Sequence, residues 1–555
     1  MGSPRDRRRR RRRGVRDHRP RGSGLKTPLP ESVETAPRAF GALDAGSATI
    51  ARRERRSDLP RPARPIGPGP PRERAGARTS DADTVTGKWW LGEHRAMDEG
   101  SVGRGPDPGT EPGPAPASGE SPTPRTGTRL VLAAGVLFGL VHLAYTAAVR
   151  PGAVALDFEV YYFAAETVLA GGPLYGVSPV GVDYLVYAYP PLTVLAFLPF
   201  TLLPPFVAYL AFTALNLAAG LLAARLLLAY LDRYGRGLDR VDRALVYAFC
   251  TLSVHAMPST VFGQVNLPLA LALVAGFSWL DRAAGTDTDT GIGSDGPDPD
   301  APDGSGGGTD GGRWASRAGV AFGLAAFVKA FPALAGVWLL RRRAWRAVAA
   351  AVATGVVGVG LGLLAFGPDT TLAYVTEALL PRAGDDAFAG GLDPGAAYVT
   401  VRRPLSVLFP GWGSLALTAG AFAVVAPVVG GLYVRLDAGT PLGRLVGAYA
   451  TVAGTLVFLP SFPVYGVLLY LPVVPLLYVL EGRAYVAFLA GALLWNLSVR
   501  FDDVRTVLAA FGADGVAGSL RPAFALVTPS LVGLAVMFLA CWLALGRAGT
   551  TGDVA

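Results

Sequence analysis

Long uninterrupted apolar blocks constrain this sequence more than any other feature. Residues 130–149 contain no acidic residue, lysine or arginine, and similar blocks recur as far as residue 545. A helix of about twenty residues is about 30 Å long, which matches the bilayer core. At that length only helices satisfy their backbone hydrogen bonds within lipid. With 51% of its 555 residues hydrophobic, the chain is predicted to be an all-α polytopic membrane protein.

Arginine clusters between the blocks predict the topology, because cytoplasmic loops are enriched in Lys and Arg. Such clusters occur at 233–243, 341–346 and 435–444. All three lie on the cytoplasmic side of the membrane if block 244–280 makes one net crossing. We therefore expect about ten crossings of the cell membrane, and up to twelve apolar segments, with both termini cytoplasmic. The other predicted spans are 204–231, 319–340, 347–366, 415–434, 445–459, 464–480, 486–499 and 523–545, with 191–203 short or re-entrant.

Two polar segments, 150–191 and 367–410, lie on the opposite side of this predicted membrane. The first carries four acidic residues and a single basic one, so it does not resemble a cytoplasmic loop. The second is also rich in acidic residues. We expect both to be external loops, and together they could form a site at the outer face.

The membrane domain is expected to occupy 126–548. Residues 1–125 form an Arg/Pro/Gly-rich tail without apolar period, which is typical of disorder. A disordered acidic insert is expected at 281–313 and a short tail at 549–555. The composition changes at Met97, which suggests that residues 1–96 are dispensable.

The net charge of +9 arises from the N-terminal tail. Residues 1–96 carry 24 Lys or Arg against 11 Asp or Glu, a net of +13, which leaves −4 for the remainder. The arginine run at 7–13 could bind nucleic acid or anionic lipid. A disordered extension is the favoured interpretation, so we expect membrane lipids but no nucleic acid as partners.

The sequence offers no ligand set for a metal or cofactor. Its two cysteines, Cys250 and Cys541, both lie inside apolar blocks, and its four histidines are widely scattered. Neither a dinucleotide-binding fingerprint nor a P-loop nor an HExxH motif is present. We therefore expect neither a metal nor a cofactor.

Motifs that follow one another in a particular order suggest a family. They are D-F-E-V-Y-Y from 157, L-A-G-G-P-L-Y at 169–175, Y-A-Y-P-P at 187–191, G-Q-V-N at 263–266, and G-L-A-A-F-V-K-A-F-P at 323–332 with a basic turn at 343–346. Over about 130–480 they resemble glycosyltransferase family 87, GT-C-type mannosyltransferases that use polyprenyl-phosphate sugars. The sequence departs from that pattern at two positions. Residues 398–406 stand where an Asn-Gln-Ser-like motif is expected, and residues 461–465 stand where a Trp/His-containing motif is expected.

This resemblance implies a GT-C-like helical bundle with an outer-face site. It implies an inverting, metal-independent glycosyltransferase that takes a hexose, mannose by resemblance, from a polyprenyl- or dolichyl-phosphate carrier. The acceptor would be a glycolipid or another glycan. A transporter or flippase of lipid-linked glycans is the alternative, although no internal repeat typical of transporters is found. A purely structural membrane protein is a third, weaker hypothesis.

Asp157 is the candidate general base of such a transfer. The reaction needs a group that takes the proton of the acceptor hydroxyl, and a partly desolvated carboxylate suits this role. The resemblance places the catalytic base at Asp157, with Glu159 ranked second. The structural alternative is that Asp157 caps the following helix, since Asp is a favoured N-cap residue.

Lys329 is the candidate ligand of the donor phosphate. It is the only lysine outside the N-terminal tail and lies inside an apolar block, where a charged group is costly and usually faces a cavity or a partner. The alternative is that it snorkels to the interface. Arg402 and Arg403 are further candidates. The alternative, that they are an ordinary solvated pair in a loop, is equally favoured.

Gln264, Asn266 and Tyr189 complete the predicted substrate-binding set. The two amides could contact sugar or lipid, or could simply hydrogen-bond neighbouring helices. Tyr189 belongs to the Y-P-P motif, but an interfacial aromatic belt would explain it equally well. Tyr465 has a weaker claim, and His255 is expected to be a satisfied residue between helices.

Overall fold

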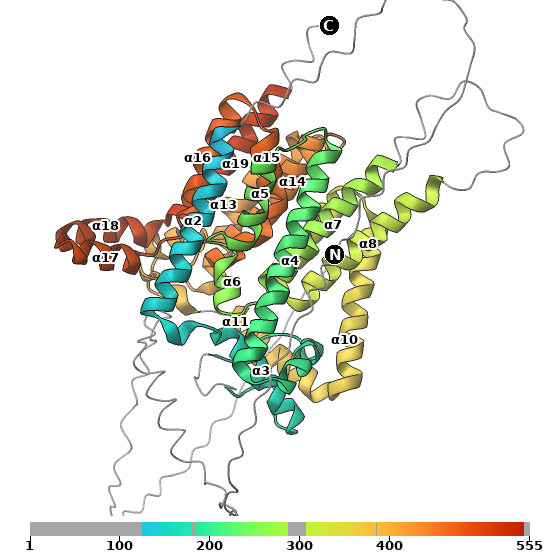
Figure 1. The fold of residues 1–555 in the computed structure, drawn as a ribbon, viewed down its shortest axis with the longest axis vertical. Helices are drawn as coiled ribbons and strands as arrows, with labels where there is room; N and C mark the ends of the chain where they lie inside the picture. Colours follow the sequence, from blue (N-terminus) through green and yellow to red (C-terminus); the bar gives the residue numbers. More distant parts are fainter. Residues whose placement is uncertain (1–124, 179–184, 287–306, 384–385, 549–555) are drawn as a thin grey trace, which may run out of the picture. The chain divides into compact units, whose positions relative to one another are not determined.

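The computed structural model describes residues 125–178, 185–286, 307–383 and 386–548 (Figure 1). No strand occurs within these ranges, so the predicted all-α fold is confirmed. The α-helices are α2 (Thr126–Val149), α3 (Leu156–Leu169), α4 (Pro205–Arg233), α5 (Arg240–Leu252), α6 (Met257–Val261), α7 (Asn266–Thr286), α8 (Gly307–Val328), α9 (Ala335–Arg341), α10 (Trp345–Ala373), α11 (Leu380–Ala383), α12 (Arg402–Leu408), α13 (Ser414–Arg435), α14 (Pro441–Phe458), α15 (Tyr470–Val479), α16 (Gly482–Asn496), α17 (Phe501–Ala510), α18 (Asp514–Leu526) and α19 (Pro529–Ala548).

Seven of the described helices are long and apolar enough to cross a membrane: α2, α4, α7, α10, α13, α14 and α19. The pair α16 and α17, bent by 74°, would make an eighth. Two other predicted spans are interrupted: 319–340 by the 3-10 helix η4 (Phe331–Leu334) between α8 and α9, and 464–480 by η7 (Pro463–Leu469) before α15. The chain is therefore a multi-pass membrane protein, but the predicted number of ten crossings is not confirmed.

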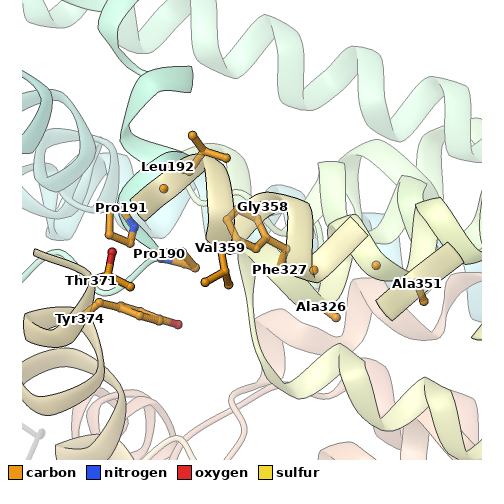
Figure 2. Close-up of a pocket in the computed structure, with 13 residues that line it drawn as sticks. Pro190, Pro191, Leu192, Ala326, Phe327, Ala351, Gly358, Val359, Thr371 and Tyr374 are labelled. Atoms are coloured by element: carbon orange, nitrogen blue, oxygen red, sulfur yellow. The ribbon is translucent and has the colours of Figure 1, made fainter. Parts of the chain in front are cut away.

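Small residues allow α8 to lie close against α10. A side chain at Gly319 would come within 2.2 Å of the Ala347 carbonyl oxygen, and one at Gly323 within 2.7 Å of the Ala351 carbonyl oxygen. Helices in lipid associate largely through such close backbone packing. Beside this contact the two helices leave an apolar cavity of about 270 Å³, lined at one end by Pro190, Pro191 and Tyr374 (Figure 2).

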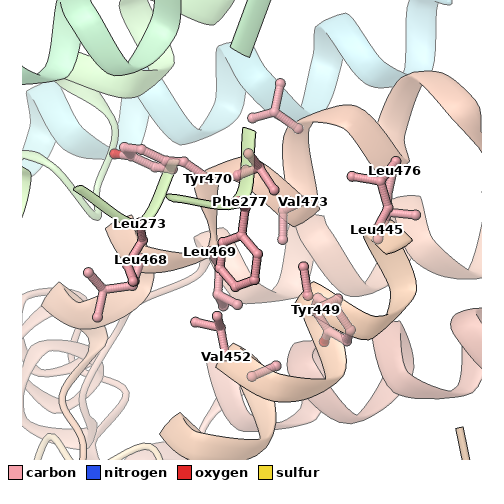
Figure 3. Close-up of a cluster of buried hydrophobic side chains, with 14 of the residues drawn as sticks. Leu273, Phe277, Leu445, Tyr449, Val452, Leu468, Leu469, Tyr470, Val473 and Leu476 are labelled. Carbon is pink, nitrogen blue, oxygen red and sulfur yellow. The ribbon is translucent and has the colours of Figure 1, made fainter. Parts of the chain in front are cut away.

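The core of the bundle lies where α7, α14, η7 and α15 meet. Leu273 and Phe277 of α7 contact side chains of α14 and of the η7–α15 segment (Figure 3). Helix α14 is the most enclosed of the long apolar helices, with 78% of its apolar window buried. This packing holds η7 against α7, and η7 carries Tyr465 toward the candidate site described below.

The ends of four helices share one carboxylate. Asp281 of α7 pairs with Arg342 at 2.7 Å and with Arg444 at 3.3 Å, and its Oδ2 accepts a hydrogen bond from the Tyr230 hydroxyl at 2.7 Å. These partners come from the end of α9, from α14 and from α4. Helix α7 continues through Thr286 and α8 begins at Gly307, so both ends of the insert predicted at 281–313 are helical in the described residues.

The two predicted external loops contact each other. Tyr175, in the first, and Tyr374, in the second, have ring centroids 5.9 Å apart. Tyr175 follows α3 and Tyr374 follows α10, whose lower end lies near α3 in Figure 1. The arginines at 341–346 lie at the junction of α9 and α10. The assignment of these ends to the outside and the cytoplasm stays a prediction. The proposed tails, 1–124 and 549–555, and the stretch 287–306 lie outside the described residues.

Candidate functional site

Backbone carbonyls at the end of α6, and not a side chain, cap the start of α3. The Ala155 amide donates to the Val261 carbonyl at 2.8 Å, and the amides of Asp157 and Phe158 donate to the Phe262 carbonyl at 2.9 and 3.0 Å. Ala155 is the N-cap residue and makes no side-chain cap hydrogen bond. The capping explanation of Asp157 is therefore wrong, and its carboxylate is left for another partner.

That partner is Gln264, which a glycine turn brings beside α3. Gly263 has a φ of +77°, a left-handed conformation that glycine adopts without a Cβ penalty. A Cβ at this position would lie 2.4 Å from the Cβ of Phe158, so only glycine allows so close an approach. Gln264 Nε2 then donates to Asp157 Oδ2 at 2.6 Å.

The hydrogen bonds continue from Gln264 to Lys329. Asn266, the first residue of α7, donates from Nδ2 to Gln264 Oε1 at 2.5 Å. Lys329 donates from Nζ to Asn266 Oδ1 at 2.7 Å. Lys329 immediately follows the end of α8, at the break before η4, which turns its side chain toward α7. Residues from three separate motifs thus form one series, Lys329–Asn266–Gln264–Asp157.

Aromatic rings line this series. The Lys329 Nζ lies 4.6 Å from the ring centroid of Tyr465 and 5.7 Å from that of Tyr189. The hydroxyls of Tyr189 and Tyr161 are 2.9 Å apart, and the Tyr175 hydroxyl donates to the Tyr189 carbonyl at 2.5 Å. Ring faces stabilise a nearby cation, so the aromatic wall partly replaces water around the ammonium.

The electrostatics of Asp157 suit proton transfer. Burial raises the pKa of its carboxyl above the ordinary value, while the hydrogen bond from Gln264 and the charge of Lys329 act in the opposite direction. Burial likewise raises the pKa of the Tyr189 and Tyr161 hydroxyls, so both stay neutral hydrogen-bond donors. The site therefore combines a basic carboxylate with a neutral phenol pair.

Glu159 lies two residues further along the first turn of α3 and is half-buried. It is not a member of the hydrogen-bonded series that joins Asp157 to Lys329. Glu159 stays the second-ranked candidate for the base, behind Asp157.

Arg402 and Arg403 are not a solvated pair, and Arg403 hydrogen-bonds backbone carbonyls outside this series. Both are buried at the start of α12. Arg403 donates to the carbonyls of Tyr398 at 3.2 Å, of Phe524 at 2.7 Å and of Ala396. Its guanidinium ties the second loop to α18, so we remove Arg403 from the proposed phosphate ligands. Arg402 shares this buried position.

Two residues beside the series were not in the predicted set. Tyr161 stands four residues after Asp157 and therefore on the same helix face, a spacing that could have revealed it. Tyr465, for which the sequence supported only a weaker claim, lies against Lys329 from the segment that departs from the family pattern. His255 matches its expected structural role: it stacks on Trp495 with centroids 3.7 Å apart and hydrogen-bonds Asn496.

The apolar cavity between α8 and α10 begins beside this series. Pro190 and Pro191 line its end and directly follow Tyr189 in the chain. Along its length it is lined by small or apolar residues, including Ala326, Gly355 and Gly358 (Figure 2). Only 11% of the apolar window of α10 is buried, so this helix is open to the surrounding lipid. Among the described residues no group of three His, Cys, Asp or Glu side chains could hold a metal ion.

Comparison with known proteins agrees with the motifs. Residues 187–461 match the model of glycosyltransferase family 87. Over 245 residues the chain is 28% identical to a polyprenol-phosphate-mannose-dependent alpha-(1-2)-phosphatidylinositol pentamannoside mannosyltransferase of Mycolicibacterium smegmatis. The aligned part covers 43% of this chain and about half the length of that relative, 50%. No solved structure matches. The resemblance inferred from the sequence is thus confirmed, and the chain carries a glycosyltransferase family 87 region within a multi-pass membrane protein.

Proposed function

We propose that this protein is a membrane glycosyltransferase that transfers mannose from a polyprenyl-phosphate carrier to a glycolipid at the outer membrane face. One observation carries the proposal: a carboxylate, Asp157, and an ammonium, Lys329, are joined through two amides beside the apolar cavity between α8 and α10. A sugar-phosphate lipid needs these elements, namely a base, a cation and a place for its hydrocarbon chain.

In the proposed reaction Asp157 takes the proton of the acceptor hydroxyl. The hydroxyl oxygen forms a bond to C1 of the sugar, and the bond between C1 and the phosphate oxygen breaks with inversion. The electron pair leaves with the polyprenyl phosphate, whose developing charge faces the Lys329 ammonium. Only Asp157 Oδ2 is used in the hydrogen bond to Gln264, which leaves Oδ1 for the acceptor hydroxyl.

The cavity between α8 and α10 is the proposed seat of the polyprenyl chain nearest the phosphate. Its end at Pro190 adjoins Tyr189, whose ring centroid lies 5.7 Å from Lys329 Nζ. A phosphate held by Lys329 would therefore lie close to the mouth of the cavity. The name of the mycobacterial relative supports a polyprenol-phosphate-mannose donor and a phosphatidylinositol mannoside acceptor.

The test is transfer by the purified full-length chain in nanodiscs. Polyprenyl-phosphate [¹⁴C]mannose and a phosphatidylinositol mannoside would be supplied, and labelled product measured. Positioned acid–base catalysis contributes about 10² to 10⁴ in rate, so Asp157→Asn should lower turnover by that factor and Glu159→Gln by much less. Near-wild-type transfer by folded Asp157→Asn would move the base to Glu159. Transbilayer movement of lipid-linked glycan without mannose transfer would instead support a flippase.

A further inference from the structure

The two amides between Lys329 and Asp157 each use both their nitrogen and their oxygen in hydrogen bonds within the protein. Asn266 is completely buried, and both of its side-chain polar atoms are hydrogen-bonded, one to Lys329 and one to Gln264. Gln264 likewise uses its oxygen toward Asn266 and its nitrogen toward Asp157. Asn266 is closed to a sugar hydroxyl by its burial, and a hydroxyl could reach only the second N–H or lone pair of the half-buried Gln264.

The ends of the series fix the orientation of both amides. A lysine ammonium can only donate hydrogen bonds, and an ionised carboxylate can only accept them. Asn266 must therefore present its oxygen to Lys329 and its nitrogen to Gln264, and Gln264 must present its nitrogen to Asp157. Amide orientations are ordinarily ambiguous, but here the chemistry of the two ends removes the ambiguity.

We infer that Gln264 and Asn266 are positioning residues, which form a one-directional hydrogen-bonded relay that couples the ionised carboxylate of Asp157 to the ammonium of Lys329. This inference rests on the proposed function, because it assigns Asp157 and Lys329 to the two halves of one transfer. It replaces the prediction that the two amides bind substrate.

The relay responds to the protonation state of Asp157. Protonation of Asp157 weakens the relay, because a neutral carboxyl accepts from Gln264 Nε2 only through its carbonyl oxygen and without charge assistance. Reversing both amides would not help, because it would turn the Asn266 NH₂ group toward the ammonium, donor against donor. The relay is therefore strongest when Asp157 is ionised and Lys329 is charged. The ammonium has further N–H donors for a phosphate, so the relay can persist when the donor lipid binds.

Other titratable groups near Asp157 must be separated from this effect. Tyr161 and Tyr189 face it from α3 and from the Y-P-P segment, and Tyr465 adjoins both. From α2, the His142 ring meets the Phe262 ring edge-on with centroids 6.0 Å apart. Of these only histidine ordinarily titrates near neutral pH, so His142→Leu is the control for the pH profile.

The experiment is the pH dependence of kcat/KM for Gln264→Met, which keeps the side-chain length but removes the hydrogen bond. Without that bond the ionised form of Asp157 is less favoured. We expect the acid limb of the profile to move up by about one pH unit. Well above the limb the rate should return to within about threefold of wild type. Asn216→Leu, which removes another buried amide from α4, and His142→Leu should leave the limb unchanged.

Two outcomes would overturn the inference. If the limb of Gln264→Met coincides with wild type and only the KM rises at every pH, the amide contacts substrate, while the proposed function stands. If Gln264→Met does not fold, Gln264→Glu serves instead. Its second carboxylate beside Asp157 should move the limb further in the same direction, and an unmoved limb would also reject the relay.

A substrate-free measurement separates the inference from the proposed function. The infrared carbonyl band of protonated Asp157, assigned by its loss in Asp157→Asn, can be titrated in nanodiscs. Gln264→Met should raise the midpoint of that titration by about one pH unit. This result would support the relay even if wild-type protein transferred no mannose, which would refute the function alone. An unchanged midpoint would refute the relay alone.

Discussion

Replacing Gly355 by leucine should obstruct the proposed polyprenyl cavity without disturbing the bundle. Gly355 lines the cavity from α10, and a Cβ built there meets no atom within 4 Å. Gly360 on the same helix also has open space around it but does not line the cavity, so Gly360→Leu is the matched control. Both substitutions exchange glycine for a better helix former and should affect the intrinsic stability of α10 equally.

The magnitude follows from the size of the cavity. Leucine adds four carbon atoms to a space of about 270 Å³. A lipid chain must then share that space or leave it, and overpacking typically costs about 1–3 kcal/mol. Because about 1.4 kcal/mol is a factor of ten, the KM for the donor should rise roughly 5- to 150-fold. Turnover at saturating donor should change little, because the cavity does not contain the reacting atoms.

The assay compares a long polyprenyl-phosphate mannose with a short-chain analogue whose tail ends before Gly355. Gly355→Leu should raise the KM of the long donor much more than that of the short one, whereas Gly360→Leu should raise neither. An equal change in KM, relative to wild type, for the long and the short donor in Gly355→Leu would refute the assignment of the cavity to the lipid chain, provided that melting temperature and turnover are unchanged.

Four further predictions concern the site, the fold and the topology. Lys329→Met removes the proposed phosphate ligand and should raise the donor KM roughly 10- to 100-fold, since hydrogen bonds to charged groups contribute about 1.5–3 kcal/mol; an unchanged KM would exclude this role. Arg403→Ala leaves buried carbonyls without a hydrogen-bond partner, so it should destabilise the protein by about 2–4 kcal/mol in thermal unfolding. The KM of the folded fraction for the sugar donor should not change. A selective rise in that KM would restore Arg403 as a phosphate ligand. Gly263→Ala combines a strained φ with a clash against α3, so it should lower both melting temperature and turnover, and retention of both would contradict the close contact. A membrane-impermeant thiol reagent added outside should label Ala387→Cys but not Trp345→Cys in a chain whose native cysteines are replaced; the reverse pattern would invert the topology.

The sequence predicted the helical membrane fold because apolar blocks leave few alternatives within lipid. It could not place the helix breaks. The segment 319–340 is apolar throughout except for Lys329, so its hydropathy does not show that α8 stops at Val328. That break matters most, because it turns the Lys329 side chain toward Asn266.

The motifs also singled out Asp157, Gln264 and Lys329 as separate residues, but not the connection between them. The connection depends on the approach of Gly263 to α3, a contact between segments about 100 residues apart. For Arg403 the sequence suggested a solvated pair as readily as a ligand. Its partner, the carbonyl of Phe524, is 121 residues away in the sequence. Because every residue has a backbone carbonyl, the amino-acid sequence does not reveal which one accepts this hydrogen bond.

The shared carboxylate of Asp281 has a practical consequence. Its bonds to Arg342, Arg444 and Tyr230 anchor the end of α7, while Gly319 and the following turn anchor α8 against α10. The chain is thus held independently on both sides of 287–306. A rigid fiducial domain inserted between α7 and α8 would therefore be attached to two separately anchored helices, which suits the enlargement of this membrane protein for electron cryomicroscopy.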